Sequence, residues 1–174
     1  MRKIAKHALR GVVVWVGLMA APAMAASGNQ SSQGGSSQAQ VVKPIRITHG
    51  NLDGSAATLN FGKFTAVGSG SVTVQTSGFA YTGGSVNHVP GSSTSVDSFV
   101  ITGEPSRLFG ILVSSGSVSN GSRQMNFTPQ VQFGSAVLDS AGVKQLKVGG
   151  VLSVPSNMPV GVYSGSYVVR ATYQ

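Results

Sequence analysis

Short apolar runs separated by glycine- and serine-rich stretches constrain the fold of this chain more than any other feature of its sequence. Within the runs, apolar and polar residues alternate with the period of two that is typical of half-buried β-strands. From residue 41 onward no stretch has the period of an α-helix. Because breaks at intervals of roughly eight to twelve residues are typical of sandwiches and barrels, we predict an all-β fold. The expected architecture is a two-sheet antiparallel β-sandwich of about eight or nine short strands.

Residues 161–174 form the clearest predicted strand. Tyr163, Tyr167 and Tyr173 fall on one face, and mostly polar side chains fall on the other. We expect one long strand at an edge of a sheet, where unpaired backbone N–H and C=O groups are open to another chain. Tyr163 lies beside a glycine at the start of this strand, which is typical of a tyrosine corner, whose hydroxyl bonds back to the backbone. The segment favours assembly over catalysis.

Two irregularities are predicted near the start of the domain. Residues 41–48 read as a strand, but Pro44 has no N–H to donate, so the strand is expected at a sheet edge or at a bulged position. In residues 59–64, Phe61 falls on one face and the next phenylalanine on the other. A β-bulge at Gly62 would restore the register.

Other breaks are predicted farther along. Residues 68–70 and 116–117 are rich in glycine and serine and read as hairpin turns. Residues 108–113 are continuously apolar, as expected for a strand covered on both faces. Pro129 is expected to separate two strands, whereas the Gly149-Gly150 pair is expected to bend one strand whose apolar residues line a single face.

Residues 1–25 have the pattern of a cleaved secretory signal peptide. Four basic residues precede an apolar stretch about half as long as the ~20 residues that span a membrane. The small-residue site Ala23-Met24-Ala25 predicts cleavage before Ala26. We therefore expect export to the periplasm, the cell surface or the medium, with no membrane span in the mature chain.

The remaining chain divides into a tether and a domain. Residues 26–40 contain serine, glutamine, glycine, asparagine and alanine, with too little apolar surface to fold, and are predicted to be a disordered tether. Residues 41–174 are long enough for one β-sandwich domain with a core of its own. Because the sequence has no cysteine, neither disulfides nor a lipid-anchored cysteine contribute.

Charge and titratable residues limit the possible functions. The net charge of +8 falls to +4 when the predicted signal peptide is removed, and the remaining basic residues are too scattered for a nucleic-acid interface. His49 and His88 are the only histidines of the predicted mature chain, and both are expected in loops. Since no catalytic or metal-binding motif accompanies them, we predict no enzyme, no cofactor and no metal site. A hydrolase is kept as a remote alternative.

Four motifs together carry a resemblance to a known family. They are Phe61-Gly62-Lys63-Phe64, residues 99–105 (FVITGEP), residues 147–152 (KVGGVL), and residues 161–165 (GVYSG) followed by Tyr173. In this order they resemble the family known as domain of unknown function 4402, over residues 41–174. That family is similar to fimbrial subunits and to spore-coat-U-like secreted proteins of Gram-negative bacteria. The resemblance implies an exported immunoglobulin-like sandwich without an established catalytic role.

The resemblance also implies partners, namely other pilin-like subunits or an assembly chaperone. Pilin-like domains are completed by a strand from a neighbour, whose backbone supplies the hydrogen bonds. Residues 26–40 offer no large apolar side chain for such a donated strand, so the chain is expected to interact through the edges of its own sheets. The residues predicted for structural or interaction roles are Phe61, Gly62, Tyr163, Gly165, Tyr167 and Tyr173.

The predicted function is therefore that of a fimbrial-like or cell-surface coat component that acts by β-strand edge pairing. The alternative is a periplasmic or secreted module that binds carbohydrate or protein. Such a module would use loop side chains, of which residues 79–81 (Phe-Ala-Tyr) and His88 are candidates. A coat component would assemble, whereas a binding module would remain a monomer.

Overall fold

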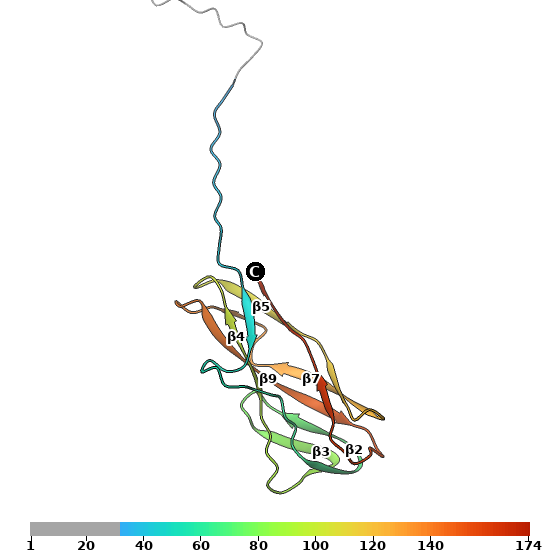
Figure 1. Ribbon diagram of the computed structural model, residues 1–174. Coiled ribbons are helices and arrows are strands. Elements are labelled where there is room, and N and C mark those ends of the chain that lie inside the picture. The colour runs from blue at the N-terminus through green and yellow to red at the C-terminus, as the bar shows by residue number, and fades with distance from the viewer. Residues whose placement is uncertain (1–31) are drawn as a thin grey trace, which may run out of the picture. The chain divides into compact units, whose positions relative to one another are not determined.

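The computed structural model describes residues 32–174 and contains, within them, eleven β-strands and no helix (Figure 1). The strands are β1 (Arg46–His49), β2 (Phe64–Val74), β3 (Ala80–His88), β4 (Asp97–Thr102), β5 (Leu108–Val113), β6 (Gly116–Ser119), β7 (Gln124–Val131), β8 (Ser135–Val137), β9 (Val143–Val154), β10 (Ser164–Ser166) and β11 (Val169–Tyr173). Every strand pair is antiparallel. The predicted all-β antiparallel fold is confirmed, although the chain has more strands than predicted.

The strands form two sheets, as expected for a sandwich. In the larger sheet β1, β4, β9, β7, β6 and β10 lie side by side, and the β2–β3 hairpin joins β9 through β2. The smaller sheet has the order β11, β5, β8. Figure 1 shows β9 running diagonally across the domain. One edge of β9 pairs with β7, and the other pairs first with β4 and then with β2.

Two clusters of buried apolar side chains form the core, and β9 contributes to both. The first cluster consists of Phe61, Val72, Val74, Val86, Met125, Phe127, Leu152 and Val154. The second consists of Ile101, Phe109, Leu138, Leu146 and Val148. All the buried β9 side chains come from alternate positions, as the predicted single apolar face requires. The strand continues through Gly149 and Gly150, which lie between the two clusters in sequence.

The C-terminal segment is not one strand, and that prediction was wrong. β10 pairs with β6 in the larger sheet, whereas β11 pairs with β5 in the smaller one, so the chain changes sheets at Tyr167 and Val168. The predicted inward face is nevertheless present. Tyr163 packs against the first core cluster, Tyr173 against the second, and Tyr167 against both.

The predictions for residues 41–48 and 59–64 were partly wrong. β1 begins only after Pro44, at Arg46, and lies at a sheet edge as predicted. Residues 59–64 do not form a strand with a bulge. Asn60 makes one isolated bridge, and Gly62 has a left-handed φ of 77° and donates its N–H to the Asn60 side chain at 2.9 Å. A local side-chain bond of this kind competes with the strand ladder.

Three predicted breaks are not breaks. Residues 68–70 lie inside β2, where the pairing with β3 shifts register between Ala66 and Gly70, and residues 116–117 begin β6. Pro129 lies inside β7, opposite Gly150. Along β7, the pairing with β6 covers only residues 124–127. The neighbouring edge is therefore open beside Pro129, which is where a strand tolerates proline.

β5 is not covered on both faces, which corrects the interpretation of its continuous apolar sequence. Phe109 is fully buried, but Leu112 on the opposite face is 68% exposed. Among the described residues no layer lies over this outer face of the smaller sheet.

The N-terminal predictions fall largely outside the described residues. The predicted signal peptide and residues 26–31 of the predicted tether are not described. Residues 32–45 have no regular secondary structure, and the compact unit that holds the sheets is Gln40–Gln174. Within residues 32–174, no helix has the length and hydropathy to cross a membrane.

Candidate functional site

β1 and β11 are edge strands of different sheets that lie beside each other. In the described part of the chain, β1 pairs only with β4 and β11 pairs only with β5. In Figure 1 the C-terminal residue lies at the same end of the domain as the start of β1. The Tyr173 hydroxyl donates a hydrogen bond of 2.8 Å to the Lys43 carbonyl just before β1. The two open edges therefore meet along one side of the sandwich.

The hydrogen bonds of β11 show which backbone groups face outward. Gln174 donates its N–H to Leu108, and the Val168 carbonyl accepts from Ser114. Because residues of an antiparallel pair alternate between facing and turning away from the partner strand, Val169, Ala171 and Tyr173 direct their N–H and C=O groups away from β5. β11 thus presents an unpaired row of backbone donors and acceptors.

The same alternation applies to β1. Gly50 donates its N–H to the Ser98 carbonyl at 2.8 Å, which places Thr48 and Arg46 at the positions that bond to β4. Ile47 and His49 therefore direct their backbone groups toward the open edge. The sandwich has two such rows on one side, one in each sheet.

Half-buried apolar side chains lie beneath these backbone rows. Ile45, Ile47, Val169, Ala171 and Tyr173 all pack against the second core cluster without being fully buried. A strand added along this side would therefore find both backbone partners and apolar surface to cover.

Tyr173 closes one end of this side of the domain. Besides donating to Lys43, its hydroxyl accepts the Glu104 N–H at 2.7 Å. The Lys43 N–H donates to the Glu104 carboxylate at 2.9 Å. The Arg107 guanidinium lies 5.7 Å from the Tyr173 ring centroid, within reach of a cation–π contact. The Tyr173 side chain therefore holds the segment that leads into β1. Its backbone N–H and C=O groups remain unpaired at the edge of β11.

A buried carboxylate connects β1 with the point where the chain changes sheets. Asp97 is 4% exposed, and its Oδ1 accepts the Ser98 N–H at 2.8 Å and lies 2.6 Å from His49 Nε2. Its Oδ2 accepts the Tyr167 hydroxyl at 2.7 Å. Burial first, and then the hydrogen bond and charge of Asp97, raise the pKa of Tyr167 above its ordinary value. This network holds Tyr167 between the two core clusters.

Both histidines were predicted to lie in loops, and that prediction was wrong, because each is the last residue of a strand. His49 is the last residue of β1 and stacks on Phe99, with ring centroids 4.9 Å apart. His88 is the last residue of β3, and its Nε2 is buried without a hydrogen-bond partner. Among residues 32–174 no three histidine or acidic side chains come together in a way that could hold a metal ion.

Sequence reasoning missed the Asp97 network, although a signal was present. Phe99 and Ile101 fall on one face of a strand in the sequence, and the same period of two places Asp97 on that face. An acid on the apolar face of a strand predicts a buried carboxylate with hydrogen-bond donors around it. Which donors approach it depends on Tyr167 and His49, which are distant in sequence.

The remaining predicted residues have structural positions. Phe61 is buried in the first core cluster and meets Phe127 edge to face, with ring centroids 5.8 Å apart. Gly62 forms the turn described above. Gly165 pairs with Val118, and a Cβ at this position would overlap the Ser117 carbonyl oxygen. None of these three residues belongs to β1 or β11, and Gly165 lies in β10, at the other end of the larger sheet from β1.

Tyr163 makes the backbone hydrogen bond predicted for it, because its hydroxyl donates to the Pro159 carbonyl at 2.8 Å. Replacing Tyr163 by phenylalanine is expected to lower the free energy of unfolding by about 1 kcal/mol, the net contribution of one hydrogen bond. Urea denaturation measures this difference. Tyr81→Phe is the control, since Tyr81 is exposed and the structure shows no hydrogen bond from its hydroxyl. Equal urea midpoints for Tyr163→Phe, Tyr81→Phe and the wild type would show that the Tyr163 hydrogen bond does not stabilise the fold.

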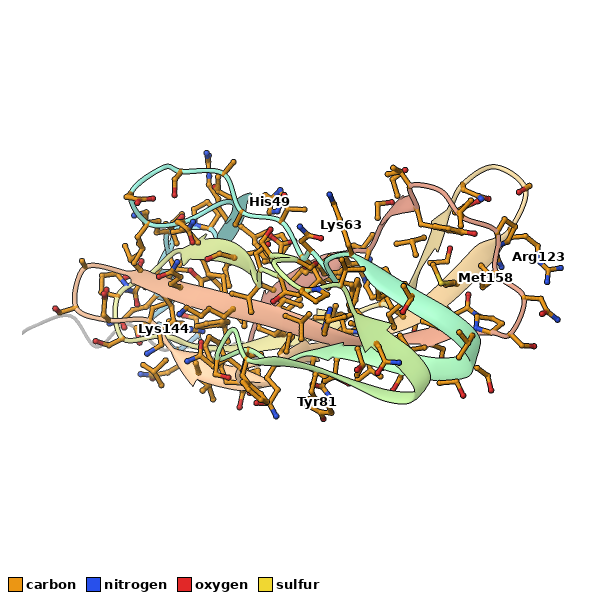
Figure 2. All side chains as sticks on the ribbon, turned by 90° about the horizontal axis from the view of Figure 1, so that it is seen from below. His49, Lys63, Tyr81, Arg123, Lys144 and Met158 are labelled. Atoms are coloured by element: carbon orange, nitrogen blue, oxygen red, sulfur yellow. The ribbon has the colours of Figure 1, made fainter. Side chains whose placement is uncertain are left out.

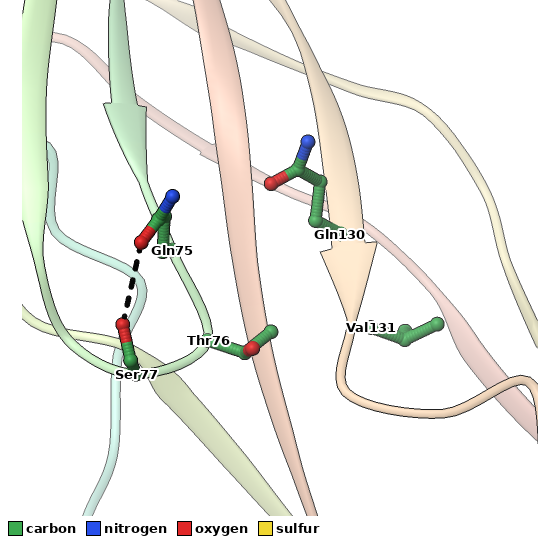
Figure 3. Close-up of a pocket in the computed structure, with 5 residues that line it drawn as sticks. All are labelled: Gln75, Thr76, Ser77, Gln130 and Val131. Carbon is green, nitrogen blue, oxygen red and sulfur yellow. Dashed lines mark hydrogen bonds between the residues drawn. The ribbon is translucent and has the colours of Figure 1, made fainter.

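Two open depressions lie elsewhere on the surface. The first, of about 580 Å³, is lined by Gln75, Thr76, Ser77, Gln130 and Val131 (Figure 3). The second, of about 400 Å³, is lined by Gln132, Phe133, Lys144, Gln145 and Lys147. Neither contains a residue of β1 or β11.

Comparison with known proteins gives one match. The model of the family described as "Domain of unknown function (DUF4402)" matches residues 52–173. No curated protein and no solved structure matches the chain.

Proposed function

The chain belongs to the family described as "Domain of unknown function (DUF4402)", and from this premise we propose that it is an exported fimbrial-like or cell-surface coat component. It acts by pairing an open strand edge with another chain, and its partners are other pilin-like subunits or an assembly chaperone. The observation that carries the proposal is the outward-facing backbone row of β11 above half-buried apolar side chains. Such an edge supports strand addition, because backbone groups supply affinity and apolar contacts supply specificity.

The β11 edge is the better candidate of the two. Soluble proteins protect sheet edges with proline and charged side chains. β1 has Pro44 just before it and Arg46 at its first position. β11 contains Arg170 but no proline, and its inward side chains are Val169, Ala171 and Tyr173. β11 is therefore the edge that another strand would extend.

Support for export comes from the sequence. The predicted signal peptide of residues 1–25 directs the chain across a membrane, and the absence of cysteine makes folding independent of the redox state outside the cytoplasm. The protein then acts in the periplasm, at the cell surface or in the medium.

The proposal is tested on protein sheared from the surface of cells that express it. Denaturing gels are run with and without boiling. A ladder of high-mass species that collapses to one band on boiling is expected, because subunits joined through a shared sheet separate slowly. A single monomer band in both lanes, with the protein in the periplasmic fraction, would favour the monomeric binding module instead.

Ala171→Pro is expected to abolish the ladder while the domain still folds. The Ala171 N–H points away from β5, so proline removes a donor from the open edge and none from the ladder inside the sheet. Ala171→Val is the matched control, because it keeps the N–H, and it should assemble. Val169→Pro is a second variant of the same design. The thermal unfolding curve shows whether Ala171→Pro is folded. A folded Ala171→Pro protein that still forms the ladder would rule out pairing at β11.

A further inference from the structure

Two exposed aromatic side chains lie together at the β2–β3 hairpin, outside β1 and β11. Phe79 is 64% exposed and Tyr81 is 47% exposed, and their ring centroids are 6.1 Å apart with 34° between the ring planes. They are two residues apart on one face of the hairpin. Tyr81 projects from the surface in Figure 2. Large aromatic groups exposed as a pair indicate a binding surface more strongly than single ones.

The aromatic pair borders the first depression. Gln75 donates its N–H to the Phe79 carbonyl at 2.8 Å, so these residues face each other across the hairpin. Tyr81 lies opposite Thr73 in the adjoining register. Phe79 is thus the pairing partner of Gln75, one of the residues that line the depression.

Gly149 of β9 lies between the two glutamines in the sheet. It pairs with Gln130 of β7 on one side, and on the other side a Cβ at this position would meet the backbone of Gln75 and Thr76. Glycine at this position therefore lets the backbone of Gln75 and Thr76 approach β9 closely, and β9 places no side chain between Gln75 and Gln130. Figure 3 shows Gln75 just after the end of β2 and Gln130 in β7.

The chemistry of this surface selects a class of ligand. Its polar side chains are amides and hydroxyls, which both donate and accept hydrogen bonds, and none carries a charge. The rings of Phe79 and Tyr81 supply flat apolar area beside them. A saccharide without charged groups has matching features, namely hydroxyl groups around its rim and an apolar C–H face.

We propose that this amide–aromatic surface binds a neutral saccharide. It consists of Gln75, Thr76, Ser77, Phe79, Tyr81 and Gln130. A ring of the saccharide stacks on the aromatic pair, and its hydroxyl groups bond to the amides of Gln75 and Gln130. The depression beside the aromatic pair has a volume of about 580 Å³ and is open to solvent, so the saccharide would bind at the surface. The site goes beyond the proposed assembly function, because none of its residues belongs to β1 or β11.

The test uses saturation-transfer NMR on the purified protein with maltotetraose, cellotetraose, chitotetraose and mannotetraose as neutral probes. Sialyllactose is the charged comparison. Binding of at least one neutral probe, with weaker binding of sialyllactose, is expected. No binding of any neutral probe would overturn the proposal, and it would be the result if the surface serves a protein partner. Equal binding of sialyllactose would overturn the selection for neutral saccharides.

Substitutions then locate the site. Tyr81→Ala and Gln130→Ala are each expected to weaken binding of the neutral probe by about tenfold. Val160→Ala, at a fully exposed position, is the control and should bind as the wild type does. Phe79→Ala is a second aromatic variant in case Tyr81→Ala does not fold, as judged by circular dichroism. Unchanged binding in the folded aromatic variant and in Gln130→Ala would place the saccharide elsewhere and overturn the assignment.

The two proposals fail independently. Tyr81→Ala should keep the high-mass ladder of the unboiled gel and lose saccharide binding. Ala171→Pro should lose the ladder and keep saccharide binding. Loss of both properties in Tyr81→Ala, with the fold intact, would contradict the separation of the two surfaces.

Discussion

Replacing Asp97 by alanine is expected to lower the free energy of unfolding by about 3 kcal/mol, because it removes the acceptor of several buried hydrogen bonds. The Tyr167 hydroxyl and the Ser98 N–H would both lose their partner. Tyr167 is the residue at which the chain passes between sheets, and it packs against both core clusters. We therefore expect the loss to loosen the C-terminal segment first, and hydrogen exchange of β10 and β11 measures it alongside urea denaturation.

Asp97→Asn is the matched variant for this prediction. Its Oδ1 still accepts the Ser98 N–H, and its amide donates to the Tyr167 hydroxyl, which can act as an acceptor. We expect a loss of only about 1 kcal/mol. A double-mutant cycle with Tyr167→Phe separates the contribution of the Asp97–Tyr167 pair. Equal stability of Asp97→Ala and the wild type would show that the network does not support the fold.

Gly149→Ala is expected to be the most damaging glycine substitution in β9, with a loss of about 3 kcal/mol or more. The new Cβ would overlap the Val74 carbonyl oxygen and approach the Gln75 carbonyl carbon to 2.9 Å. These are backbone atoms, which cannot rotate out of the way. The position is critical because the partner strand along this edge of β9 changes there. β4 pairs with β9 as far as Val148, and β2 pairs with it from Gly150 onward.

Thermal unfolding measures this effect, and for a domain of this size the loss corresponds to a fall in Tm of about 10 °C. Gly134→Ala is the control, because Gly134 is exposed and no atom lies within 4 Å of a Cβ there. Its Tm should stay close to that of the wild type. A similar Tm for Gly149→Ala would mean that β2 and β4 can move apart at little cost.

Part of the fold could be predicted because it depends on neighbouring residues. Alternation in β9 placed Leu146, Val148, Leu152 and Val154 on one buried face, and Pro44 predicted the edge position of β1. The inward face of the C-terminal tyrosines was predicted in the same way. These features follow from the period of two and from the missing N–H of proline, which act within a single strand.

Composition predicted the structure less well where the same residue types suit two different structures. Glycine and serine mark turns, but in residues 68–70 they lie inside β2, where the pairing of β2 and β3 is irregular. The apolar sequence of β5 reads as a strand buried on both faces, yet its Leu112 side is open. Neither outcome is visible without the partner strands.

Local patterns in the chain were enough to predict an antiparallel all-β fold and the side chains that face its core, because side-chain direction repeats along each strand. Which strands pair follows only from the folded arrangement. It divided the C-terminal segment between two sheets at Tyr167, joined Tyr167 and His49 through Asp97, and brought β1 beside β11. It also placed Phe79 next to Gln75, which lines the first depression, and Tyr81 next to Phe79. These arrangements depend on contacts between residues far apart in the chain, which a local pattern does not encode.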